Sequence, residues 1–99
     1  MPFKEIKRKV NQVILNKRAH ESFITIPSAL LKHFPKYMKL LFDKEHNMIA
    51  LQHSEDSCDY PSARRIWCTA FFQEYNISSQ EIEVLWDEKR KMLIGRLRK

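Results

Sequence analysis

Lys and Arg side chains are the most informative chemical groups in this sequence, and their excess over acidic residues is greatest near the start of the chain. The formal net charge is +6, and the first 20 residues hold six Lys or Arg side chains against a single acid, Glu5. Because this excess is segregated, we expect a local positive potential that attracts a polyanion, with nucleic acid as the first candidate. Contacts to phosphates would give an affinity that falls with salt and discriminates little between bases. The candidate DNA-binding residues in this segment are Lys7, Arg8, Lys9, Lys17 and Arg18. Arg64 and Arg65, which precede the second expected helix, would extend the same surface if a pseudo-twofold axis relates two similar units of the chain.

Catalysis and metal binding are disfavoured, so we predict no enzyme, no metal and no cofactor. Asp43 and Asp87 open two polar turns, where a carboxylate more often bonds the turn backbone than acts as an acid or base. Cys58 and Cys68 are expected to be unpaired thiols, since two cysteines in such different surroundings do not suggest a disulfide. The histidines, which lack the spacing of metal ligands, are His20, His33, His46 and His53.

Composition indicates one small domain. The 99 residues are 43% hydrophobic and 11% aromatic, which is ample for a single core. No apolar run approaches the length that spans a membrane, and the charged N-terminus lacks the apolar stretch of a secretory signal. We therefore expect an intracellular, cytoplasmic protein without a membrane partner.

Two parts of the chain follow one pattern. The run from Ile24 to Leu51 is echoed, residue class by residue class, by the run from Arg65 to Ile94, with an offset of 41 residues that becomes 44 in the later part. Internal similarity of this kind indicates a duplicated folding unit, although a common amphipathic pattern could mimic it. Each half is too small to bury a core alone, so the halves must share one. The identical pairs are Ala29/Ala70, Leu41/Leu85, Asp43/Asp87 and Met48/Met92.

Each unit is predicted to contain a strand, a short helix, a strand, a turn and a strand, which makes the fold α+β with mainly antiparallel pairing. The first helix begins at Pro27 and ends before Pro35, and Ser28 and Thr69 are expected to cap the two helices. Residues 6–15 are expected to be extended, with a short helix as the alternative. The other expected strands are 23–26, 37–42, 48–51, 64–68, 81–86 and 92–97. We predict one domain, 1–99, built from pseudo-repeats at about 1–52 and 64–99 and joined by a polar connector, 53–63.

The first of these units resembles a known family. The segments from Ser22 to Lys32, Leu40 to Asp43 and Met48 to Leu51 are similar to the AbrB-like (SpoVT-AbrB) DNA-binding domain of bacterial and archaeal transition-state regulators and antitoxins. Its pattern is a strand ending in Ile-Pro, a short Leu-bearing helix and an apolar hairpin. The resemblance covers about residues 10–52 well and 64–97 faintly.

The resemblance implies a swapped-hairpin pseudo-barrel made from two copies, here in one chain as in the MraZ branch, that binds duplex DNA through basic residues near its first strand and the following loop. The chain departs from the family at Glu21-Ser22, where Gly-Arg is common, and at Cys68, which replaces the proline in the second copy. The loss of the proline suggests that the second repeat is purely structural.

A second function of another class stays open, in which the protein is an intracellular protein–protein interaction module with no nucleic-acid role. The basic segment would then meet an acidic patch, and Tyr37, Met38 and Trp67 could be exposed anchors. A homodimer is also compatible with such small, partly apolar units. Base stacking by aromatic residues is a minority interpretation, because most of them fall at core spacing. These residues are Trp67, Phe71, Phe72 and Trp86. Basic segments can also serve solubility alone.

Overall fold

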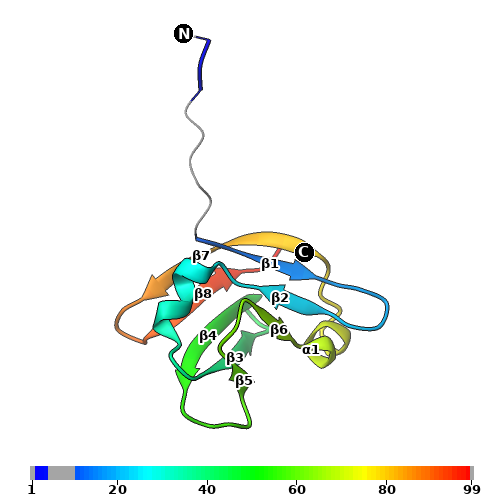
Figure 1. Ribbon diagram of the computed structural model, residues 1–99. Helices are drawn as coiled ribbons and strands as arrows, with labels where there is room; N and C mark the ends of the chain where they lie inside the picture. Colours follow the sequence, from blue (N-terminus) through cyan, green and yellow to red (C-terminus); the bar gives the residue numbers. More distant parts are fainter. Residues whose placement is uncertain (1, 5–10, 99) are drawn as a thin grey trace.

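The computed structural model describes residues 2–4 and 11–98, and within them eight strands form one antiparallel sheet (Figure 1). The elements in chain order are β1 (Gln12–Asn16), β2 (Phe23–Thr25), η1 (Ser28–His33), β3 (Tyr37–Asp43), β4 (Met48–Ser54), β5 (Tyr60–Pro61), β6 (Arg65–Trp67), α1 (Thr69–Glu74), β7 (Gln80–Asp87) and β8 (Met92–Arg96). Neighbouring strands follow the order β5-β3-β4-β8-β7-β1-β2-β6. Because the two outermost strands, β5 and β6, are in contact, the sheet curls into a nearly closed barrel-like shape.

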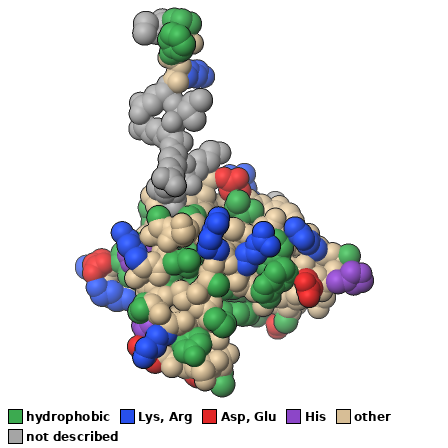
Figure 2. Space-filling model, viewed as in Figure 1, with side chains coloured by type: hydrophobic (Ala, Val, Ile, Leu, Met, Phe, Trp, Pro, Cys, Tyr) green, Lys and Arg blue, Asp and Glu red, His purple; other side chains and the backbone are tan. Residues whose placement is uncertain are grey.

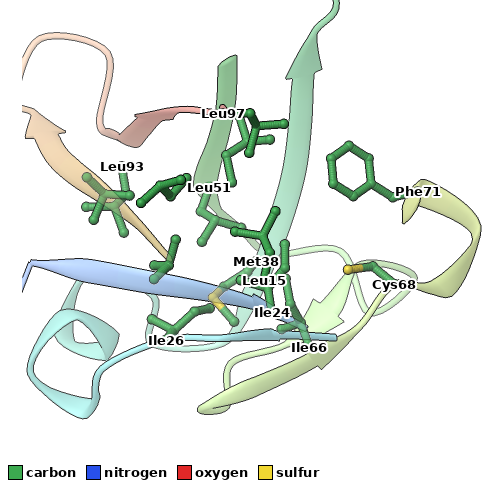
Figure 3. Packing of buried hydrophobic residues seen from close by; sticks show 14 of the residues in the cluster. Leu15, Ile24, Ile26, Met38, Leu51, Ile66, Cys68, Phe71, Leu93 and Leu97 are labelled. Carbon is green, nitrogen blue, oxygen red and sulfur yellow. The ribbon is translucent and has the colours of Figure 1, made fainter. Parts of the chain in front are cut away.

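Alternation of apolar side chains along the strands fills the interior of the barrel. In β1, Val13 and Leu15 are fully buried, whereas Ile14 between them is exposed. Figure 3 shows buried side chains from strands far apart in the sequence, including Ile24 and Ile66, meeting in one cluster. The predicted antiparallel fold is therefore observed in its coarser form, as a mostly antiparallel, barrel-like sheet with few helices.

Two short helices lie at opposite ends of the barrel in Figure 1. The first was predicted to begin at Pro27 but begins at Ser28, and it is a 3₁₀ helix, in which the Leu30 N–H donates to the Pro27 carbonyl at 2.9 Å. The predicted side-chain caps are wrong, because Pro27 and Cys68 occupy the cap positions and neither forms a side-chain cap hydrogen bond. Thr69 instead accepts a hydrogen bond from the Ser22 N–H at 3.0 Å, so its hydroxyl anchors a distant loop.

The two long hairpins, β3–β4 and β7–β8, close with turns of the same chemistry. Asp43 accepts the N–H three residues later at 3.1 Å, and Asp87 accepts the N–H groups two and three residues later at 3.0 and 3.2 Å. These bonds confirm that both carboxylates serve turn backbones. Asn47 and Lys91, which close the turns, both have φ of 55°.

The segment predicted as a polar connector, 53–63, is partly sheet. Strand β4 continues to Ser54, and β5 pairs with β3 by setting Tyr60 opposite Met38. Tyr60 packs against the core, which gives this otherwise polar segment a reason to pair. At the start of the chain, the predicted extended segment is a strand from Gln12 onward, whereas residues 5–10 lie outside the described residues.

Candidate nucleic-acid interface

An aromatic ring on the outer face of the barrel brings two of the predicted arginines together. Phe23 precedes the inward-pointing Ile24, so its ring points outward from β2. It is nevertheless only 2% exposed. The guanidinium carbons of Arg18 and Arg65 lie 4.9 and 5.1 Å from its ring centroid, which is the geometry of cation–π contacts. These arginines come from positions 47 residues apart in the chain and share one support.

Trp67 completes this surface. It pairs with Phe23 across β2 and β6, and the two ring centroids lie 4.7 Å apart at an interplanar angle of 50°. Its neighbour Ile66 is buried in the core, so alternation along β6 directs Trp67 outward, where 49% of it is exposed. We call Arg18, Phe23, Arg65 and Trp67 the arginine–aromatic surface.

The loop that carries Arg18 is held in place by hydrogen bonds to the buried residue Ser22. Ser22 is 1% exposed, and its hydroxyl accepts the Arg18 N–H at 3.2 Å. The Ser22 carbonyl also accepts the Cys68 N–H at 3.0 Å, while its own N–H donates to Thr69. The loop is thereby tied to the start of α1, so Arg18 leaves the barrel from a fixed backbone position.

The other described candidate cations lie around this surface. Arg64 precedes β6, and its carbonyl accepts the Ile26 N–H at 2.6 Å while its side chain is exposed. Lys17 is tied to the loop before β7: its N–H donates to the Ser79 hydroxyl at 2.8 Å, and its ammonium lies 3.5 Å from the Asn76 amide oxygen. The remaining candidates, Lys7, Arg8 and Lys9, lie outside the described residues.

Among residues 2–4 and 11–98, the side chains of Lys17, Arg18, Arg64 and Arg65 have no carboxylate partner and can meet an external anion. The ion pairs in this part of the chain involve other side chains, such as Lys36 with Glu55 and Lys91 with Glu88. Figure 2 shows Lys and Arg side chains in a row across the face that carries η1, β2 and β6, with hydrophobic side chains between them. Cations without carboxylate partners and an exposed aromatic ring are the groups that contact phosphates and bases in nucleic acids.

The sequence predicted both arginines but not the packing of Phe23 against Trp67. Of the two interpretations of Trp67, the core position is wrong, because Ile66 alone points inward from the three-residue strand, and the exposed position is confirmed. The sequence Arg65-Ile66-Trp67 held the signal: if Ile66 is buried, both of its neighbours must face outward.

A second surface is apolar and lies on the outer face of the two hairpins. Leu41, Ala50, Ile94 and Leu85 are cross-strand neighbours in one row over β3, β4, β8 and β7. Leu85 is 75% exposed, and the groove beside it has a volume of about 730 Å³. The prediction that Met38 is an exposed anchor for a protein partner is wrong, because its side chain points into the core and is fully buried.

Reactive and metal-binding groups do not converge in the described part of the chain. No cluster of three His, Cys, Asp or Glu residues there could hold a metal ion. Both cysteines are free thiols, with Cys58 exposed and Cys68 buried, and burial raises the pKa of the Cys68 thiol to about 12. No helix among these residues has the length and apolar character needed to cross a membrane.

Comparisons of the chain with protein-family models, curated proteins and solved structures find no match.

Proposed function

We propose that this protein is a duplex-DNA-binding regulator of the AbrB-like type, and that the arginine–aromatic surface is where DNA binds. The observation that carries the proposal is the convergence of Arg18 and Arg65 on Phe23. Two guanidinium groups fixed on one ring lose little side-chain freedom when they bind phosphates. Lys17 and Arg64 lie next to them in the sequence and extend the positive surface.

We further propose that the chain is an internal duplication with swapped hairpins. Elements β1, β2, η1, β3 and β4 are followed in the same order by β5, β6, α1, β7 and β8. The first strand of each set pairs with the hairpin of the other, since β1 pairs with β7 and β5 with β3. The turn residues Asp43 and Asp87, and the positive-φ residues Asn47 and Lys91, share one offset of 44 residues. These correspondences support a pseudo-twofold arrangement of two modules.

The DNA proposal is tested by fluorescence anisotropy of a labelled duplex of mixed sequence over a salt series. Each phosphate contact contributes about 0.9 to the steepness with which log K falls against log salt. Arg18→Gln/Arg65→Gln removes two such contacts, so the slope should become shallower by about 1.8. Over the decade between 1 M and 0.1 M salt this amounts to a loss of roughly 60-fold in affinity at 0.1 M. The matched control, Lys44→Gln/Lys89→Gln, removes the same charge from the hairpin turns and should change affinity far less. Absence of any binding at low salt would refute the proposal.

A second candidate, protein–protein interaction, is favoured by the apolar row on the hairpins. The row ends at Leu85, whose exposed fraction is unusually high for a leucine. The partner that we test is a second copy of this chain. Multi-angle light scattering should show a dimer that dissociates in Leu85→Lys but persists in Ile14→Lys, a matched change on the outer face of β1. A monomer at all concentrations would exclude a dimer through this face.

A further inference from the structure

We infer that Trp67 stacks on a nucleobase, so the arginine–aromatic surface binds bases as well as phosphates. This inference rests on the proposed function and deepens it. Phosphate contacts explain exposed cations, but an indole ring carries no charge and offers its faces to other flat, apolar groups. A nucleobase that is not covered by stacking against adjacent bases is such a group.

The position of Trp67 suits this role. The ring is half exposed on the outside of β6, and it rests against Phe23, which is itself covered and cannot serve as the base contact. The buried Ile66 next to it and the pairing with β2 hold the backbone in place. An aromatic side chain held in this way has little conformational freedom left to lose on binding.

The two arginines are placed to cooperate with such a contact. Arg18 and Arg65 lie over Phe23, and Trp67 packs against that same ring, so one aromatic support carries two cations and one exposed indole. Proteins that bind single-stranded nucleic acids combine the same two components: cations along the phosphate backbone and aromatic rings on which the bases stack. Because every base has a π-face, we expect the Trp67 contact to tolerate any base.

In a fully paired duplex the base faces are covered by stacking, so the base must come from a locally opened site. An unpaired base in a duplex and a base in a single strand present the same chemistry to Trp67. The experiment therefore uses three labelled probes of equal length: a fully paired duplex, a duplex with one central unpaired base, and a single strand. Binding is measured for the wild type, Trp67→Ala and Trp67→Phe over a salt series.

We expect Trp67→Ala to weaken binding to the probe with a free base face by roughly 5- to 160-fold, with no change in salt slope, because no phosphate contact is lost. Trp67→Phe should retain most of the affinity. Loss on the unpaired-base duplex assigns the base to an opened duplex site, and loss on the single strand alone assigns it to single-stranded DNA. Quenching of Trp67 fluorescence by the same probe, recorded in a Trp86→Phe background, should accompany binding.

The inference fails if Trp67→Ala, shown by circular dichroism to be folded, binds all three probes as the wild type does. A loss that comes with a lower salt slope would also overturn it, because the contact would then be electrostatic. These results leave the proposed function intact. Failure of the wild type to bind any probe at low salt would overturn both proposals, so the two failures are distinguishable.

Discussion

Substitution of the only glycine, Gly95→Ala, should destabilise the barrel by overpacking its core. Gly95 faces inward from β8, opposite Val84 of β7. A Cβ atom there would lie 2.8 Å from Val84 Cγ1, 2.9 Å from Ile82 Cδ1 and 3.1 Å from the Glu83 carbonyl oxygen. Ordinary carbon–carbon contacts are about 3.5–4.0 Å. Strand β8 is held between β4 and β7, so it cannot shift away, and we expect a cost of about 1–3 kcal/mol in the free energy of unfolding.

A double-mutant cycle separates this clash from other effects of the added methyl group. Val84→Ala removes the closest carbon, so the cost of Gly95→Ala/Val84→Ala should be smaller than the sum of the single costs by at least about 1 kcal/mol. The control pairs Gly95→Ala with Ile24→Val in β2, which lies three strands away, and should be additive. Free energies come from equilibrium denaturation in urea. A Gly95→Ala protein as stable as the wild type, or an additive cycle with Val84→Ala, would refute the predicted contact.

The hairpin turns and the thiols give further predictions. Lys91→Gly should raise the free energy of unfolding by about 1 kcal/mol, because a non-glycine residue at φ of 55° is strained. Asn47→Gly should not raise it, because the substitution also removes the hydrogen bond that the Asn47 side-chain amide donates to the Leu97 carbonyl at 3.0 Å. Equal effects in urea denaturation would contradict this difference. At neutral pH an alkylating reagent should modify Cys58 rapidly and Cys68 only after unfolding, as mass spectrometry would show. The folded-state pKa of Cys68, about 12, lies above its ordinary value of 9.0. The contribution of the Cys68 thiol to stability, measured relative to Cys68→Ala, should therefore be complete below about pH 9 and fall progressively as the pH rises toward about 12. Parallel pH profiles of the two proteins would refute this linkage.

Strand positions were largely predictable because the buried residues alternate along them. Each hairpin was predicted from two apolar strands joined by a turn that begins with Asp, and both hairpins are confirmed. Strand β5 was missed, because two residues within a polar segment carry no periodic signal and pair only through the tertiary contact of Tyr60. A short helix near Pro27 was predicted, but the apolar pattern did not distinguish a 3₁₀ helix from an α-helix.

The candidate site was only partly predictable, for a related reason. Arg18 was predicted from the charge excess of the N-terminal segment, and Arg65 from its position before the second expected helix. Their convergence depends on the pairing of β2 with β6, which joins residues 42 positions apart, as in Ile24 with Ile66. Trp67 falls at core spacing in the sequence, and its outward position follows only once Ile66 beside it is known to be buried.

NMR titration of the ¹⁵N-labelled protein with a short DNA duplex at low salt would show residue by residue where DNA binds. Shifts should concentrate in the β1–β2 loop, β2 and β6, including the backbone amides of Arg18 and Arg65 and the indole N–H of Trp67. The amides of Leu85 and Ile94, on the outer face of the hairpins, should stay unchanged. Shifts confined to that hairpin face, or no shifts at all, would contradict the assignment of the arginine–aromatic surface as the DNA-binding site.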